Sequence, residues 1–187
     1  MGLYHDTEWG FPVVDDRRLF EKLSLEGFQS GLSWRTILAK RPAFRKAFDD
    51  FDVEAVARYT DHDVARLLGD AAIVRHRGKI EAVISNARRY DALCAAEGSL
   101  AAFLWQHRPR AVPLRRTRRA IPAITTKSRA ASEALKSYGW RFVGPTTMYA
   151  LFQAMGLVND HVAGCYRRAP IAAIRVRIPG RQHTRAR

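Results

Sequence analysis

Two side chains that are suited to holding a cation lie close together in the segment LEGFQSGLSW. Glu26 stands between two predicted helices, at a bend marked by Gly27 and Gly31, and Trp34 follows eight residues later. A partly buried carboxylate needs hydrogen-bond donors, and an indole offers its π face to a positive charge. The segment therefore indicates a recognition pocket, although a helix-capping glutamate beside a core tryptophan fits the same residues.

A second group of residues has the composition of a zinc site. In the segment HVAGC, His161 and Cys165 are four residues apart, so on a helix both would face the same way. Imidazole and thiolate are good zinc ligands, and His5 in the opening segment MGLYHDTEWG is a third. A metal that joined the two ends of the chain would explain why Tyr4 and Trp9 crowd a terminus. A buried cysteine with an unrelated histidine nearby is the alternative.

The segment LLGDAAIVRHRGKIEAVI has the outline of a helix-hairpin-helix. A short helix ends near Gly69, an apolar hairpin follows, and Gly78 opens a helix that is expected to reach about Ala95. Such an element directs backbone N–H groups and a helix N-terminus toward a phosphate. The hairpin is rich in positive side chains, namely Arg75, His76, Arg77 and Lys79. An ordinary turn in a basic protein fits the same pattern.

Helical patterns dominate the rest of the chain, and no convincing alternating strand is present. Asp15 and Asp16 are N-cap candidates, Pro42 is placed in the first turn of a new helix, and residues 108–128 are predicted to be a loop. Many short helices with short connections indicate an all-α, irregular multi-helix globule. We expect one domain over residues 1–168, with two lobes around a pocket, and a disordered basic tail over residues 169–187.

Composition limits the classes of function. The chain has 187 residues, of which 47% are hydrophobic, so it can bury a core, but its apolar runs are too short for a membrane span. Two cysteines exclude a disulfide framework, and the start lacks the long apolar run of a secretory signal, so we expect a cytoplasmic protein. The net charge of +14 favours a polyanionic partner, although an arginine-rich proteome would give the same surplus.

Five blocks of the sequence, in the same order, resemble the DNA-3-methyladenine glycosylase I family, the constitutive alkylation-repair glycosylases of bacteria. The blocks are LYHDTEWGFP, LEGFQSGLSW, AAIVRHRGKIEAVISNAR, FVGPTTMY and GLVNDHVAGC. The resemblance extends from Leu3 to about Tyr166. It implies the fold of helix-hairpin-helix DNA glycosylases and hydrolysis of the N-glycosidic bond of N3-methyladenine in duplex DNA.

The resemblance also implies roles for individual residues. Glu26 and Tyr4 match the family residues that hydrogen-bond the methylated adenine, and we take these two as the catalytic candidates. Trp34 matches the tryptophan that stacks on the base, and Trp9 matches one beside the pocket. The hairpin residues Arg75, Arg77, Gly78 and Lys79 are the DNA-binding candidates.

Three residues match family zinc ligands, and the fourth ligand is missing from this sequence. His5, His161 and Cys165 correspond to three ligands of a structural zinc. The fourth is a cysteine in an upstream C-x-W segment, and only Met1 and Gly2 precede Leu3 here. A weaker, three-ligand site and a start that lies further upstream are both open.

The implied reaction needs the base to leave the stacked duplex, which costs a few kcal/mol. Gln29 and Leu32, beside Glu26, are candidates for the side chains that fill the space it leaves, and helix packing is their alternative role. No lysine is placed as the lyase nucleophile of the superfamily, so we expect a monofunctional enzyme. A diffusing repair enzyme of this kind is usually a monomer, and we expect this one to be associated with the nucleoid through DNA.

Three other functions remain open at this stage. The chain could be a basic DNA-binding protein without chemistry, or a truncated or degenerate relative that binds DNA or alkylated bases without efficient turnover. A glycosylase with a different base preference is the third.

Overall fold

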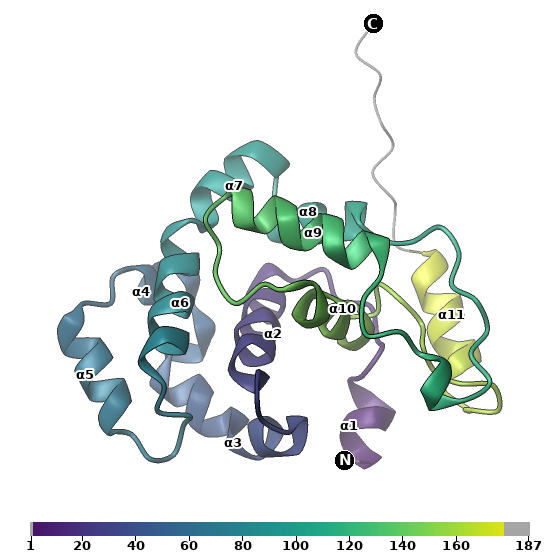
Figure 1. The fold of residues 1–187 in the computed structure, drawn as a ribbon, viewed down its shortest axis with the longest axis horizontal. Helices are drawn as coiled ribbons and strands as arrows, with labels where there is room; N and C mark the ends of the chain where they lie inside the picture. The colour runs from purple at the N-terminus through teal and green to yellow at the C-terminus, as the bar shows by residue number, and fades with distance from the viewer. Residues whose placement is uncertain (1, 178–187) are drawn as a thin grey trace, which may run out of the picture.

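The computed structural model describes residues 2–177, and these residues form helices and loops without a β-strand. Figure 1 shows α2 at the centre, the helices α3–α6 on one side of it, and α1, α10 and α11 on the other. The helices are α1 (Gly2–Thr7), α2 (Asp16–Gln29), α3 (Trp34–Ala47), α4 (Val53–Ala57), α5 (Asp61–Gly69), α6 (Arg77–Arg88), α7 (Tyr90–Glu97), α8 (Leu100–Gln106), α9 (Thr126–Ser137), α10 (Pro145–Ala154) and α11 (Arg168–Val176), with 3₁₀ turns at Asp49–Phe51 and Arg118–Ala120. The prediction of an irregular all-α fold is confirmed.

Helix α2 is the element on which the others pack. Its N-cap is Asp15, whose carboxylate accepts a hydrogen bond of 2.8 Å from the backbone N–H of Arg18. The buried side of α2 contacts α3, α6, α8 and α10, and a side chain on it is therefore held from several directions. Asp16, the other N-cap candidate, instead accepts hydrogen bonds from the backbone N–H groups of Leu100 and Ala101 at the start of α8.

An aromatic cluster joins α2 to α3 and to the turn that follows it. The rings of Phe28 and Phe44 are 4.6 Å apart, and those of Phe48 and Phe51 are 5.5 Å apart and nearly parallel. All four side chains are fully buried. Because such rings bury a large apolar area, they fix the angle at which α3 leaves the α2–α3 loop.

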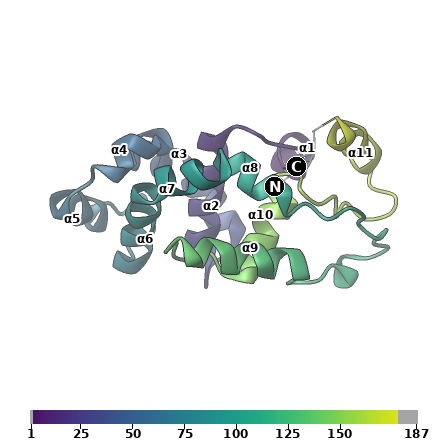
Figure 2. The same cartoon turned by 90° about the horizontal axis from the view of Figure 1, so that it is seen from above.

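The N-terminal segment is attached to the opposite side of α2 by backbone contacts. Gly10 donates to the carbonyl oxygen of Ala154, and Val13 donates to that of Met155. A Cβ on Gly156 would lie 2.5 Å from the backbone nitrogen of Pro12, and Gly156 has a φ of +74°, so only glycine fits this close approach. These contacts place α1 next to the C-terminal end of α10 (Figure 2).

Two predicted helix boundaries are wrong. Pro42 lies inside α3 and does not begin a helix, because the buried Ile37 and Phe44 continue one packed face across it. The helix that was expected from Gly78 to about Ala95 is divided at Arg89 into α6 and α7. No glycine or proline marks this division in the sequence.

The prediction of disorder from residue 169 is wrong for residues 169–176, which belong to α11. Ile171 is fully buried, and the Arg175 side chain donates to the carbonyl oxygens of Gly156 and Leu157 at 2.7 and 2.5 Å. This helix is held by one buried apolar side chain and one arginine, and two such residues do not produce a periodic pattern that the sequence analysis could recognise. Residues 178–187 lie outside the described part of the chain. Within residues 2–177, no helix has the length and apolar character to cross a membrane.

Candidate active site and metal centre

Glu26 and Trp34 lie in the same compartment, although Glu26 is not at a bend as predicted. It is inside α2, with 6% of its surface exposed, and the chain reverses after α2 through Gly31, which has a φ of +80°. Ser33 then caps α3 by accepting a hydrogen bond from the backbone N–H of Thr36. This reversal brings Trp34, the first residue of α3, back against the face of α2 that carries Glu26.

Lys22 connects the two pocket residues. Its Nζ atom lies 2.7 Å from Oε1 of Glu26 and 3.1 Å from the centre of the Trp34 ring. Lys22 has 6% of its surface exposed, so this charge lies inside the protein. Burial lowers the pKa of the Lys22 ammonium to about 8, even though Glu26 raises it. The Glu26 carboxylate and the Trp34 indole face are both complementary to a positive charge, and here they hold the Lys22 ammonium.

Tyr4 completes this side of the pocket from α1. Its ring lies 5.5 Å from that of Trp34, and 7% of its surface is exposed. Burial and the nearby Glu26 raise the pKa of the Tyr4 phenol, so the hydroxyl keeps its proton and can donate a hydrogen bond. The Tyr4 hydroxyl and the Trp34 Nε1 are buried, and neither has a hydrogen-bond partner among the described residues. Buried donors without partners are rare, and at a pocket they indicate a place for a ligand.

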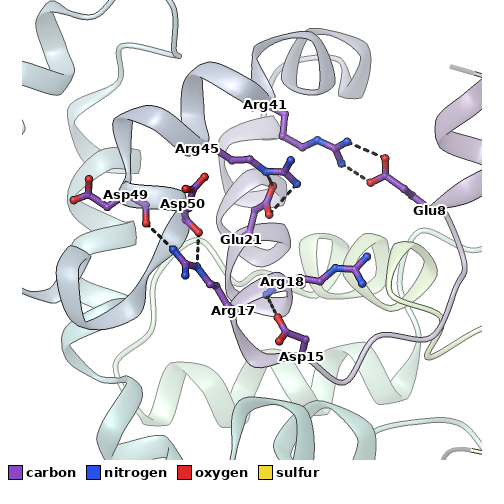
Figure 3. A network of polar contacts seen from close by, with 9 residues as sticks. All are labelled: Glu8, Asp15, Arg17, Arg18, Glu21, Arg41, Arg45, Asp49 and Asp50. Carbon is purple, nitrogen blue, oxygen red and sulfur yellow. Dashed lines mark hydrogen bonds and ion pairs between the residues drawn. The ribbon is translucent and has the colours of Figure 1, made fainter.

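A recess beside Tyr4 is lined by charged residues from α2 and α3. Two forked ion pairs stand in its wall, Arg41 with Glu8 and Arg45 with Glu21 (Figure 3). The Arg41 guanidinium also holds the pKa of Glu8 below its usual range. The pair of Glu8 and Arg41 joins the segment after α1 to α3, and the pair of Glu21 and Arg45 joins α2 to α3.

The three predicted metal ligands come together beside α1, where His5 directly follows Tyr4. The Sγ atom of Cys165 lies 3.3 Å from Nδ1 of His161 and 3.6 Å from Nε2 of His5. These separations agree with the edges of a tetrahedron around zinc, about 3.5 Å for Zn–S and Zn–N bonds of roughly 2.3 and 2.0 Å. His161 and Cys165 lie in turns between α10 and α11, so the helix that was expected to align them is absent, and a turn does so instead.

The second ring nitrogen of each histidine has its own partner. Nδ1 of His5 is 2.8 Å from a carboxylate oxygen of Asp6, and Nε2 of His161 is 3.2 Å from the carbonyl oxygen of Trp9. Such outer contacts orient metal-binding imidazoles and fix their tautomer. Burial lowers the pKa of His161, which favours the neutral form that binds a metal. The residues present therefore fit a zinc ion.

The structure places Trp9 against the cluster of His5, His161 and Cys165. Its ring lies 4.7 Å from that of His161 and 6.2 Å from that of His5. Trp9 also packs against the hydrophobic core, and its backbone N–H donates to the carbonyl oxygen of Tyr4. Trp9 thus lies next to α1, on the side that faces the cluster.

A short non-helical segment, residues 70–76, connects α5 to α6 at the place where the hairpin was predicted. Arg75 and Arg77 are exposed, and the His76 side chain caps α6 by accepting a hydrogen bond of 3.2 Å from the backbone N–H of Lys79. Gly78 lies in the first turn of α6 beside the His76 ring. Lys40 on α3 holds the hairpin by donating to the carbonyl oxygens of Ala71 and Ala72.

The role predicted for the Lys79 side chain needs correction. Its Nζ is buried and donates to the carbonyl oxygens of Phe28 and Ser30 at 2.9 and 2.5 Å, so it does not face outward with the arginines. Lys79 holds the end of α2, from which the α2–α3 loop begins. The two predicted wedge residues lie there, with Gln29 half-buried and Leu32 exposed over 42% of its surface.

Sequence reasoning missed Lys22, Glu8 and Arg41. Lys22 and Glu26 are one helical turn apart and have leucines beside them, and this spacing is a signal for an ion pair that is at least partly buried. The pair of Glu8 and Arg41 joins residues that are far apart in sequence, and nothing local indicates it.

Comparisons with known proteins identify the family of this chain. The sequence profile of the methyladenine glycosylase family matches residues 1–168. The chain is 48% identical over 165 residues to DNA-3-methyladenine glycosylase 1 of Escherichia coli, which covers 87% of this chain and 88% of that protein. It is 43% identical over 167 residues to DNA-3-methyladenine glycosylase of Haemophilus influenzae, with coverage of 87% and 89%.

The same fold is found in 3-methyladenine DNA glycosylase I from Staphylococcus aureus, for which a solved structure describes the recognition of 3-methyladenine. Its TM-score is 0.84 at 36% sequence identity, over 88% of this chain and 89% of that one. With the profile match over nearly the whole described chain, these similarities show that the chain belongs to the methyladenine glycosylase family.

Proposed function

We propose that this chain is a monofunctional DNA-3-methyladenine glycosylase that hydrolyses the N-glycosidic bond of N3-methyladenine in duplex DNA. The observation that carries the proposal is the convergence of Glu26, Trp34 and Tyr4 on one compartment. A carboxylate, an indole face and a protonated hydroxyl without a partner are the groups that would distinguish a cationic, amino-bearing purine from a neutral one.

The charge of the methylated base reduces the catalysis that the protein must supply. When the bond between C1′ of the sugar and the base nitrogen breaks, its electron pair stays with the base and neutralises it. A water oxygen then bonds to C1′, and this water loses one proton to the surrounding solvent. Glu26 holds the base and adds negative potential near the positive sugar. Tyr4 orients the base by donating a hydrogen bond from its hydroxyl.

The surface around the hairpin would hold the DNA. Arg75 and Arg77 are exposed where the N-terminus of α6 opens, and these charges together with backbone N–H groups favour phosphate. Gln29 and Leu32 would fill the space that the flipped nucleotide leaves. One chain supplies the pocket, the hairpin and the α2–α3 loop, so a monomer is sufficient.

The surroundings of Lys79 support a monofunctional reaction. A lyase needs an amine with a free electron pair that attacks C1′. The ammonium of Lys79 is buried and donates to two backbone carbonyls, so it is not available for that attack.

We propose that His5, His161 and Cys165 hold a structural zinc ion through Nε2, Nδ1 and Sγ. When bound, the ion would cross-link α1 to the segment between α10 and α11. This would hold Tyr4, the residue before His5, at the pocket. The proposed ion has a structural role only, and Glu26 and Tyr4 act in the reaction without it.

The test is release of 3-methyladenine from methylated duplex DNA, measured by chromatography of the free bases. We expect release by the wild type and by Glu54→Gln, an exposed glutamate on α4. Glu26→Gln is expected to slow release strongly. The proposal is wrong if the folded wild type releases no more base than DNA incubated alone.

A further inference from the structure

The pocket formed by Glu26 and Trp34 already contains a positive charge that belongs to the protein. The Lys22 ammonium makes an ion pair of 2.7 Å with Glu26, and it lies 3.1 Å from the centre of the Trp34 ring and 5.5 Å from that of Tyr4. The ion pair and the cation–π contact that would recognise a cationic base are therefore occupied by Lys22.

A purine cannot stack on Trp34 while Lys22 stays in this place. Stacked ring atoms need a separation of about 3.5 Å from the indole plane. The Nζ of Lys22 lies within that layer, at 3.1 Å from the ring centre. The side chains of Lys22 and Glu26 are only 8% and 5% exposed, so the two are packed without room for a further group between them. Lys22 must leave the indole face before the base enters.

Two properties of the pocket make this exchange feasible. Burial lowers the pKa of Lys22 to about 8, which means that the pocket holds the ammonium less favourably than water does. Lys22 also lines the recess beside Tyr4, whose wall contains the carboxylates of Glu8 and Glu21 (Figure 3). The wall also contains three arginines, namely Arg18, Arg41 and Arg45. A rotation of the long lysine side chain into this recess would therefore move its charge out of the buried site to a more exposed surface of mixed charge.

We propose, building on the proposed glycosylase function, that Lys22 is a specificity-determining residue that occupies the base site of the empty enzyme and competes with the base for Glu26 and Trp34. A cationic base within DNA offers Glu26 a replacement for the ammonium. The base that has been cut off is neutral and offers none. Lys22 then returns to Glu26, so it weakens retention of the product and promotes its release.

The first test measures the dissociation constant of free 3-methyladenine by calorimetry. We expect Lys22→Met and Lys22→Ala to bind it on the order of tenfold more tightly than the wild type, because the competing charge is gone. Lys136→Met, which removes an exposed lysine of α9, should bind like the wild type. In Lys22→Met the buried Glu26 carboxylate has no partner and could become protonated. Lys22→Ala leaves space for water molecules that can solvate the ionised carboxylate, so this variant controls for a change in the charge of Glu26.

The second test uses the wild type alone and does not depend on whether a variant folds. In the empty protein the methylene protons next to Nζ of Lys22 lie over the Trp34 ring, so their NMR signals are expected to be shifted upfield. Saturation with 3-methyladenine should move these signals to the positions of ordinary lysines.

Two results would overturn the role of Lys22. One is equal or weaker binding by both folded variants, and the other is a Lys22 signal that stays shifted when the base saturates the site. If the wild type neither binds 3-methyladenine nor releases it from methylated DNA, the glycosylase proposal itself fails, and this outcome is distinct from the other two.

Discussion

The carboxylate of Glu8 and the guanidinium of Arg41 form a forked ion pair, with distances of 2.8 Å from Oε1 to Nη2 and 2.5 Å from Oε2 to Nη1. It joins the segment after α1 to α3 (Figure 3). Tyr4 is on α1 and Trp34 begins α3, so this ion pair fixes the distance between the two rings of the pocket. Planar, two-point pairs of this kind are more specific in geometry than a single contact.

Replacement of Glu8 by glutamine should lower stability in a pH-dependent way. Arg41 holds the pKa of Glu8 below its usual value, so the carboxylate stabilises the fold above its unfolded pKa of about 4.3. This contribution is lost as the pH falls through the lower, folded pKa. We expect a difference of about 1 kcal/mol from the wild type near neutral pH and almost none near pH 3 in urea titrations. A difference that is constant with pH would contradict the assignment.

Glu26→Gln should bind free 3-methyladenine more weakly and excise it more slowly. Loss of one charged hydrogen bond is worth about 1.5–3 kcal/mol, or roughly 10- to 150-fold in rate or affinity. The change also leaves Lys22 buried without its carboxylate partner, so the melting temperature should fall. The double variant Lys22→Met/Glu26→Gln, which removes both charges, should recover part of that loss. Unchanged excision kinetics would remove Glu26 from the reaction.

Trp34→Ala should separate base binding from DNA binding. Loss of a stacking partner costs about 1–3 kcal/mol per base, so the affinity for 3-methyladenine should fall at least about fivefold. Non-specific DNA affinity depends on phosphate contacts and should stay near the wild-type value. Fluorescence anisotropy with unmodified duplex DNA measures the second quantity. A parallel loss of both would mean that Trp34 supports the core and not the pocket.

The metal proposal predicts that zinc stabilises the fold through Cys165. A chelator should lower the Tm of the wild type, and Cys165→Ser should have a lower Tm that the chelator changes little. Cys94→Ser is the matched control, because Cys94 lies on α7, away from the cluster. Zinc content measured on the same preparations should fall for Cys165→Ser only. Equal zinc content in both variants would contradict the ligand assignment.

Two truncations test the contribution of α11 and of the residues after it to stability and DNA binding. A chain ending at Ala169 lacks Ile171 and Arg175, which pack α11 on the loop after α10, so its Tm should fall by several degrees. A chain ending at Arg177 keeps both residues and should melt like the wild type. It lacks three arginines of the sequence, so its DNA affinity should depend less steeply on salt. Equal Tm values for the two chains would show that α11 adds no stability.

Local sequence predicted those parts of the fold that depend on short-range physics. Helix starts were visible where a capping side chain precedes an apolar pattern, as at Asp15. The division of one predicted helix at Arg89 was not visible. It depends on long-range contacts of α7, such as the hydrogen bond that the Tyr90 hydroxyl donates to Asp16.

For the candidate site, the sequence predicted which residue types take part, but it did not predict how they are arranged in space. Glu26 and Trp34 were identified, and the structure brings them together, but the bend proposed at Glu26 is a loop several residues further on. Lys79 was assigned to DNA because its charge is close to exposed arginines in sequence. The structure uses its charge to hold two carbonyls at the end of α2, and this depends on how α6 packs against α2.

The sequence by itself determined the all-α class, the order of the five family-like blocks and the chemical types of the pocket residues and predicted metal ligands, because these follow from side-chain identity and local spacing. Tertiary structure alone decided that Tyr4, Lys22 and Trp34 meet, that Cys165 reaches His5, and that Arg41 holds Glu8. Each of these contacts joins different elements or distant segments. Their energies depend on burial and distance, which arise only when the helices pack.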